Sequence, residues 1–395
     1  SSHCFFQFWF GVSIFIHFKK FLHLCLNFFI DKVSRIEITP AQLALDPCSA
    51  GAVVTDVNTG EVRALVSYPG YDNNRLANSM DVAYFNKLLE DESLPLYNNA
   101  TQTKKAPGST FKPITAIAGL EEHVINPNDI IVCNGIYDAI NPAIKCWIYP
   151  GSHGPDSVVK AIQDSCNVYF AETGHRLSTD ASGEYSSELG IERLRKYASM
   201  FGLDHKSGVE IVENEPQISD INPEQSSIGQ GNHSFANIQL ARYVSTIANQ
   251  GTVFELSLLD KVCDRYGNLV KDYTPEAKNH VDISPETWAN VKEGMNRVIK
   301  EGSARRVFTD LNVNIAGKTG TAQESKTRAN HAFFISFAPF ESPEIAVTVD
   351  IPYGYSSTNA AVIAKNIYKY YYNQISLDYI LNNSALDVSD VKIGD

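Results

Sequence analysis

Two residues three positions apart, Ser109 and Lys112, have the types and the spacing that nucleophilic catalysis needs. They lie in the stretch 106–116, where Pro107 and Gly108 are helix-start signals and apolar residues follow at helical spacing. On a helix the two side chains share a face. A serine hydroxyl is a weak nucleophile until a base takes its proton, and a lysine can be that base only when burial or a neighbouring cation lowers its pKa. The pair therefore predicts an activated serine in or just before the first turn of a buried helix.

The spacing alone is a weak signal, because a chain of 395 residues holds such pairs by chance. Ser157 and Lys160 form a second Ser-x-x-Lys pair, and either pair taken singly is explained as well by an ordinary helix start with a surface lysine. Two later stretches distinguish the first pair from the second. They are the triplet Ser165-Cys166-Asn167 and the run from Lys318 to Gln323, Lys-Thr-Gly-Thr-Ala-Gln.

In this order, Ser-x-x-Lys, Ser-x-Asn and Lys-Thr-Gly are the signature of penicillin-binding proteins and serine β-lactamases. From about residue 38 to about residue 372 the chain resembles the transpeptidase domain of a class B penicillin-binding protein. The similarity extends to residues 51–69, 228–231 (Ile-Gly-Gln-Gly) and 301–304 (Glu-Gly-Ser-Ala). It implies an α/β fold in which an antiparallel sheet is flanked by helices and joined to an all-helical subdomain.

The resemblance also implies a catalytic role for five motif residues. Ser109 is then the nucleophile, and Lys112 is its base and later the acid. Lys318 helps to hold Lys112 neutral by like-charge repulsion. Ser165 relays a proton between the two lysines, and Asn167 holds Lys112 and the substrate amide.

The strand that begins with the second lysine is expected to bind the substrate. By the same resemblance, Thr319, Gly320 and Thr321 pair edge-on with an extended peptide, and Gly320 lets the strand approach it closely. The backbone N–H groups of Ser109 and Thr321 form the oxyanion hole.

The activity that the resemblance implies is that of an acyl-serine D,D-transpeptidase, which cross-links peptidoglycan stem peptides and is covalently inhibited by β-lactams. No metal and no organic cofactor are expected. The expected partners are peptidoglycan stem peptides, β-lactam antibiotics and a membrane-embedded glycosyltransferase of the cell-wall machinery. The expected location is the cell membrane, with the catalytic domain on the extracytoplasmic face.

Three alternatives stay open: a serine β-lactamase, a D,D-carboxypeptidase, and a β-lactam-sensing domain that is acylated once and signals. A class A β-lactamase needs a carboxylate that activates water on the acyl-enzyme. Glu210, in the sequence Glu-Ile-Val-Glu-Asn, imitates that element, but its surroundings favour a surface carboxylate.

Composition limits which partners and which metal sites the chain can have. The formal net charge of −12 argues against nucleic acid as a partner. Seven cysteines are too few and too scattered for a disulfide scaffold, and no Cys-x-x-Cys or His-x-x-x-His pair predicts a metal site. Cys133 and Cys146 could meet across a hairpin and form a disulfide, or remain reduced. Cys166 is predicted to pack in the interior.

The pattern of apolar residues predicts the elements that must position these groups. A hairpin is expected at 52–57 and 61–66, helices at 158–170, 190–201, 235–249, 288–300 and 360–372, and strands at 314–320, 332–338 and 345–351. Three parts result. Residues 1–38 are an aromatic-rich segment, interpreted as a degenerate membrane anchor or a misread gene start, 39–378 are the transpeptidase domain, and 379–395 are a polar tail.

Overall fold

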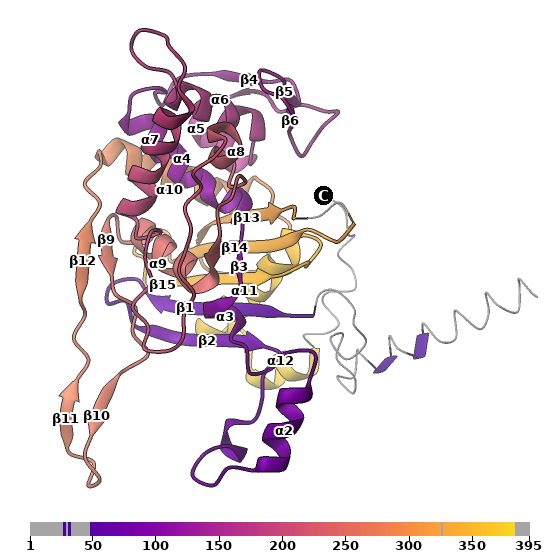
Figure 1. Ribbon diagram of the computed structural model, residues 1–395, viewed down its shortest axis with the longest axis vertical. Helices are drawn as coiled ribbons and strands as arrows, with labels where there is room; N and C mark the ends of the chain where they lie inside the picture. The colour runs from indigo at the N-terminus through magenta and orange to yellow at the C-terminus, as the bar shows by residue number, and fades with distance from the viewer. Residues whose placement is uncertain (1–26, 29–30, 33–47, 325–326, 384–395) are drawn as a thin grey trace, which may run out of the picture.

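The computed structural model describes residues 27–28, 31–32, 48–324 and 327–383. Its centre is a five-stranded sheet, antiparallel throughout, in the order β13 (Ala316–Ala322), β14 (His331–Ala338), β15 (Ile345–Ile351), β1 (Ala50–Asp56) and β2 (Val62–Tyr68) (Figure 1). The N-terminal hairpin thus pairs with the C-terminal strands, which confirms the predicted sheet. The expected anchor falls almost wholly outside the described residues.

Helices cover both faces of this sheet. On one face α9 (Asn237–Ala248) contacts β1 and β15, and Thr55 shares a 2.7 Å hydrogen bond with Ser245. On the other face α11 (Ser357–Tyr371) packs against β14 and β15, where the hydroxyl of Tyr368 donates to Ser336 at 2.9 Å. Every residue of β14 and β15 is therefore buried. Helix α10 (Pro285–Lys300) packs beside α9 and against β13.

The catalytic motifs begin in a mainly helical part, at the top of Figure 1. Its central helix, α4 (Lys112–Glu121), is buried from Lys112 to Leu120. Around it lie η3 (Gly108–Phe111), α5 (Val158–Gln163), α6 (Asn167–Leu177), α7 (Ser187–Met200) and α8 (Pro223–Ser227). This part also carries two small ladders, β4 (Ile131–Cys133) with β7 (Gly154–Asp156) and β5 (Ile136–Tyr137) with β6 (Ile144–Lys145).

One predicted helix is wrong. The amphipathic run 158–170 is not continuous but is broken between α5 and α6, and Ser165 in the break has φ +55°, in the left-handed region. The other long helices and the three C-terminal strands are confirmed within a few residues of the predicted bounds.

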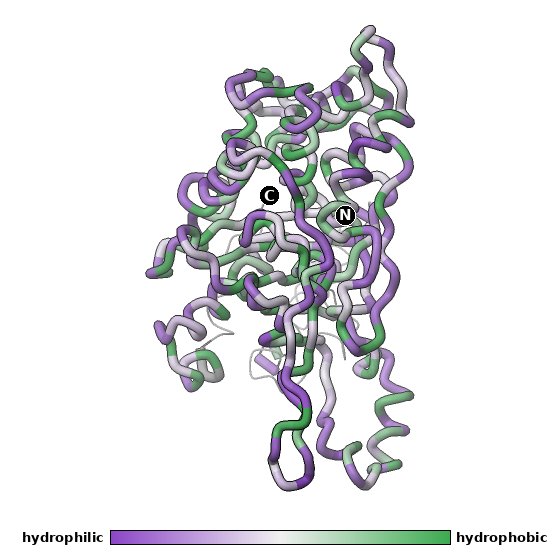
Figure 2. Tube along the Cα trace, turned by 90° about the vertical axis from the view of Figure 1, so that its left-hand side faces the viewer, coloured by the Kyte–Doolittle hydropathy of each residue, from purple (hydrophilic) through white to green (hydrophobic). Residues whose placement is uncertain are grey.

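The remaining elements are short helices and two-stranded ladders. They are η2 (Asn73–Arg75), α2 (Val82–Glu90), α3 (Asn99–Gln102), the ladder of β3 (Lys104–Lys105) with β8 (Phe235–Ala236), the ladder of β9 (Thr252–Phe254) with β12 (Ala277–His280), the hairpin of β10 (Lys261–Cys263) with β11 (Leu269–Asp272), and α12 (Leu377–Asn383). The β10–β11 hairpin projects from the body and carries exposed apolar residues, among them Val262, Leu269 and Val270 (Figure 2). Helix α12 occupies the start of the predicted polar tail. None of the helices described has both the length and the apolar character needed to cross a bilayer.

Candidate active site

Ser109 lies in η3, a single turn that leads directly into α4. The preceding Gly108 has φ +53°, a conformation that glycine adopts without strain. Its N–H donates to the carbonyl of Gly229 at 3.0 Å, and a Cβ on Gly229 would lie 1.8 Å from the Gly108 carbonyl oxygen. The predicted helix start is confirmed. The stretch 228–231 has a structural reason as well, because its first glycine lets the loop hold the turn that carries Ser109.

Strand β13 reaches the same turn from the other side. A Cβ on Gly320 would lie 2.6 Å from the methyl group of Thr110 and 2.9 Å from the carbonyl oxygen of Pro107. A Cβ on Gly108 would likewise lie 2.5 Å from the carbonyl oxygen of Thr321. The glycine of Lys-Thr-Gly therefore has a reason that the sequence did not show: it lets the strand approach the catalytic turn.

The two lysines meet at Ser165. The ammonium of Lys112 donates to the Ser165 carbonyl at 2.6 Å, to Oδ1 of Asn167 at 2.7 Å and to Oγ of Ser165 at 3.3 Å. The ammonium of Lys318 donates to Oγ of Ser165 at 2.8 Å and to the carbonyl of Thr319 at 3.1 Å. The hydroxyl of Ser165 thus bridges the two ammonium groups, in the position that a proton relay requires.

Ser109 and Lys112 are joined by a backbone hydrogen bond, from the Lys112 N–H to the Ser109 carbonyl. Among the described contacts, the side chain of Lys112 is bonded to Ser165 and Asn167 and not to Oγ of Ser109. Catalytic hydrogen bonds are often long in ligand-free enzymes and tighten when substrate binds. The side-chain pairing of Ser109 with Lys112 therefore stays a prediction.

Burial perturbs both lysines. It lowers the pKa of Lys112 from 10.5 to about 8. Burial and the neighbouring charge of Lys112 together place the pKa of Lys318 well below its usual value. Neither ammonium has a carboxylate partner among the described residues, and the charges of nearby cysteines offset only part of the cost of burying Lys112. Burial therefore favours the neutral form of both amines, as a lysine base requires.

Several of the site residues line one cleft of about 380 Å³. It contains five predicted residues, Ser109, Ser165, Asn167, Thr319 and Thr321. Lys112 and Lys318 are wholly buried behind it.

Sequence reasoning missed part of the lining, which adds Trp147, Ile228, Gln230, Ser303, Gln323, Asn330 and Ser357. Ser303 could have been found, because it belongs to the 301–304 motif, and its hydroxyl lies 2.8 Å from Oγ1 of Thr319. Trp147 carried no motif signal.

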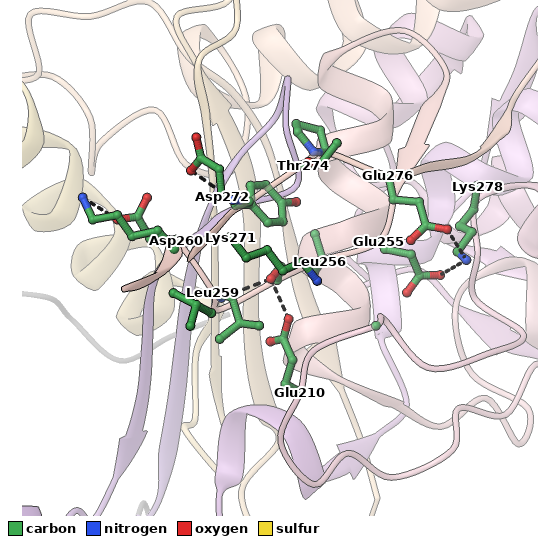
Figure 3. Close-up of a pocket in the computed structure, with 16 residues that line it drawn as sticks. Glu210, Glu255, Leu256, Leu259, Asp260, Lys271, Asp272, Thr274, Glu276 and Lys278 are labelled. Carbon is green, nitrogen blue, oxygen red and sulfur yellow. Dashed lines mark hydrogen bonds and ion pairs between the residues drawn. The ribbon is translucent and has the colours of Figure 1, made fainter. Parts of the chain in front are cut away.

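A larger cleft of about 550 Å³ lies at the base of the β10–β11 hairpin and contains none of the predicted catalytic or substrate-binding residues (Figure 3). Glu210 lines it. The carboxylate of Glu210 accepts hydrogen bonds from Oγ of Ser257 at 2.6 Å and from the N–H of Leu258 at 2.9 Å. The residue is exposed and does not line the cleft that contains Ser109. Its prediction as a surface carboxylate is confirmed.

Comparison with known proteins identifies the family and several relatives of this chain. Residues 50–369 match the family model of the penicillin-binding protein transpeptidase domain. The chain is 30% identical over 368 residues to the peptidoglycan D,D-transpeptidase MrdA of Haemophilus influenzae, covering 84% of this chain and 54% of that protein. It is 30% identical to stage V sporulation protein D of Bacillus subtilis, covering 86% and 51%. The chain thus spans about half the length of these curated relatives.

Solved structures of penicillin-binding proteins superpose on this chain. Pseudomonas aeruginosa PBP2, in complex with WCK 5153, superposes with a TM-score of 0.70 at 28% identity, covering 85% of this chain and 77% of that one. Penicillin-binding protein A of M. tuberculosis, as an imipenem acyl-enzyme complex, gives 0.68 at 25% identity, covering 80% and 73%. A chain from a peptidoglycan synthase complex described as coordinating polymerization and crosslinking gives 0.73 at 27% identity, covering 84% and 57%.

Proposed function

Because the chain belongs to the penicillin-binding protein transpeptidase family, we propose that it is a peptidoglycan D,D-transpeptidase with Ser109 as its nucleophile. The substrate is the acyl-D-alanyl-D-alanine end of a stem peptide. β-Lactams acylate the same serine.

The reaction consists of two acyl transfers. Oγ of Ser109 attacks the carbonyl carbon of the penultimate D-alanine while the serine proton passes to the neutral amine of Lys112. The C–N bond to the terminal D-alanine then breaks, and Lys112 returns the proton to the leaving amine. An amine of a neighbouring strand attacks the acyl-enzyme, its proton leaves through the same lysine, and Ser109 is regenerated. Backbone N–H groups of Ser109 and Thr321 stabilise the oxyanion in both steps.

The observation that carries the proposal is the link from Lys112 through Ser165 to Lys318. Two wholly buried lysines that share one serine hydroxyl do not stabilise the fold, since each ammonium loses hydration without gaining a carboxylate partner among the described residues. As a proton relay the arrangement is effective, because burial favours the neutral form of each amine beside a hydroxyl that can pass protons. Asn167 lines the cleft that contains Ser109 and holds Lys112 behind it by accepting its hydrogen bond.

The organisation and location of the chain belong to the same proposal. Residues 39–378 form the transpeptidase domain, which works on the extracytoplasmic face of the cell membrane beside a membrane-embedded glycosyltransferase. The similarity to a chain of a peptidoglycan synthase complex supports that partner, and the named function of the MrdA relative supports the substrate.

Incubation with benzylpenicillin, followed by intact-mass spectrometry and peptide mapping, tests the proposal. We expect one penicilloyl group per chain, on Ser109. Ser109→Ala should abolish labelling and keep the thermal unfolding midpoint, because a partly exposed hydroxyl contributes little stability.

The second Ser-x-x-Lys pair supplies the matched control. Ser157→Ala should label as the unaltered chain does. A label elsewhere, or a folded chain that takes none, would refute the assignment. The acyl-enzyme should persist far longer than it takes to form, and rapid hydrolysis over many turnovers would identify a β-lactamase instead.

A further inference from the structure

Four separate segments of the chain meet at one carboxylate oxygen near the catalytic cleft. Oε2 of Glu324 accepts three hydrogen bonds, from Nζ of Lys105 at 2.7 Å, Nε2 of His331 at 2.7 Å and the hydroxyl of Tyr353 at 3.2 Å. Glu324 follows β13, Lys105 ends β3, His331 begins β14 and Tyr353 lies between β15 and α11. We refer to these four residues as the Glu324 cluster.

The hydrogen bonds of the cluster define its protonation. The N–H of Tyr353 donates to Nδ1 of His331 at 3.0 Å, so the proton of the neutral imidazole lies on Nε2, which faces Glu324. His331 is buried, and burial lowers its pKa and favours the neutral ring. The hydrogen bond from Lys105 is the main cause that lowers the pKa of Glu324 to about 2. Glu324 is therefore an ionised acceptor with three donors.

The turn that brings Tyr353 to the cluster is strained. Tyr353 has φ +55° and Tyr355 has φ +67°, both in the left-handed region that bulky residues avoid. Such a conformation persists only where neighbouring contacts hold it. His331 accepts the N–H of Tyr353, and the carbonyl of Asn330 accepts the N–H of Tyr355 at 3.1 Å. Because Asn330 also lines the cleft that contains Ser109, these contacts hold the strained turn at the edge of the active site.

The cluster joins the two segments that carry the oxyanion donors of the proposed reaction. Lys105 lies four residues before Ser109, and Glu324 lies three residues after Thr321. The two segments already touch at the catalytic turn, where a Cβ on Gly108 would lie 2.5 Å from the carbonyl oxygen of Thr321. A single contact lets the end of a strand pivot about it. The bond between Lys105 and Glu324 is a second contact, and it fixes the direction of the strand.

We propose that Glu324 is a positioning residue for acyl transfer, which holds the end of β13 against the turn that carries the nucleophile. The N–H groups of Ser109 and Thr321 must converge on one oxygen, and a misplacement of about 1 Å in such a geometry can cost roughly a hundredfold in rate. The side chain of Glu324 is half exposed, so its ion pair contributes little to stability. The inference rests on the proposed function, because it concerns the oxyanion hole of that reaction.

Stopped-flow acylation with a fluorescent penicillin tests this role, because it separates the dissociation constant of the first complex from the rate constant of acylation. Glu324→Ala should lower the rate constant at least about tenfold and change the dissociation constant less than about threefold. Lys105→Met should also lower the rate constant. The double variant should be no slower than Glu324→Ala, because the two residues act through one contact. Thermal unfolding of each variant should show a midpoint close to that of the unaltered chain.

Glu324→Gln separates position from charge. All three donors reach the same oxygen, and the amide carbonyl of glutamine keeps an acceptor there, so this variant should recover most of the acylation rate. Glu276 supplies a matched control, because its exposed carboxylate accepts Lys278 at 2.7 Å and lines the other cleft. Glu276→Ala should leave both constants unchanged.

The outcomes distinguish this inference from the proposed function. An unchanged acylation rate constant in Glu324→Ala, or a Glu324→Gln chain as slow as Glu324→Ala, would overturn the positioning role and leave the proposed function standing. Should Glu324→Ala fail to fold, the rate constant of Lys105→Met against that of the unaltered chain decides instead. A folded, unaltered chain that takes no penicillin would refute the proposed function and the inference with it.

Discussion

The pH dependence of acylation is the sharpest test of the lysine chemistry. Burial lowers the pKa of Lys112 to about 8, and only the neutral amine can take the serine proton. With that pKa about 9% of the amine is neutral at pH 7 and about 90% at pH 9. The second-order rate of penicillin acylation should therefore rise about tenfold between these two values and level off above pH 9.

The rate can be followed by stopped flow with a fluorescent penicillin between pH 6 and 9.5, with circular dichroism to confirm folding at each point. Lys318→Met removes the donor that binds Oγ of Ser165, so the remaining reaction should be slower. Lys292 supplies a matched control, because it is another buried lysine whose pKa burial lowers but which does not line the cleft. Lys292→Met should keep the midpoint. A rate that is flat or falls from pH 6 to 9.5 would refute the neutral-lysine mechanism.

Three further predictions concern the parts around this relay. Gly229→Ala should lower both the unfolding midpoint and the acylation rate, because its Cβ would lie 1.8 Å from the Gly108 carbonyl; Gly183→Ala, with a similar positive φ but open space around it, isolates the cost of backbone strain. Glu210→Gln should leave the lifetime of the penicilloyl-enzyme unchanged in a decay assay, since this carboxylate lines another cleft. Asp350→Asn should raise the thermal midpoint at pH 7, because burial raises the pKa of Asp350 to about 8 and one carboxyl oxygen has no hydrogen-bond partner among the described residues.

The sign of the last effect follows from proton linkage. The folded chain keeps the proton of Asp350 up to about pH 8, whereas the unfolded chain loses it near pH 3.8. The unaltered protein therefore loses stability as pH rises through this window, at up to about 1.4 kcal/mol per pH unit. The advantage of Asp350→Asn should be small at pH 4, grow to about pH 8 and stay constant above it. An advantage that is equal at pH 4 and pH 8 would show that Asp350 is not protonated in the folded state. An equal loss of stability and acylation rate in Gly229→Ala and Gly183→Ala would contradict the first prediction. A penicilloyl-enzyme that lives much longer in Glu210→Gln than in the unaltered chain would contradict the second.

The sheet was predictable because its strands carry their own signal. Alternating or continuous apolar runs mark β1, β2, β14 and β15, and β15 begins and ends at the predicted residues 345 and 351. The five proposed catalytic residues could be singled out for a different reason: their types and order match a known chemistry, and the fold has only to bring them together. The fold does this for Lys112, Ser165, Asn167 and Lys318 through hydrogen bonds.

What the sequence hid depends on contacts between distant segments. The short ladders β4–β7 and β5–β6 pair only two or three residues each, too few to produce a periodic pattern. Cys133, Cys146, His153 and Cys166 come together although no two of them stand at a motif spacing. The packing of Gly229 on Gly108 joins loops more than a hundred residues apart, and a glycine in a sequence does not reveal what will fill the space beside it.

The broken helix at 164–166 shows why local propensity failed where the chemistry lies. In an unbroken helix the carbonyl of Ser165 would accept the N–H of Tyr169, four residues on. The left-handed conformation of Ser165 removes that bond, and the N–H of Tyr169 donates to Sγ of Cys166 instead. The freed carbonyl accepts the ammonium of Lys112 at 2.6 Å, while the hydroxyl of the same residue accepts Lys318 at 2.8 Å. A continuous helix would satisfy the amphipathic pattern but would take the Ser165 carbonyl away from Lys112. The chain gives up local helical bonding at this point because two lysines from other segments need both oxygens of Ser165.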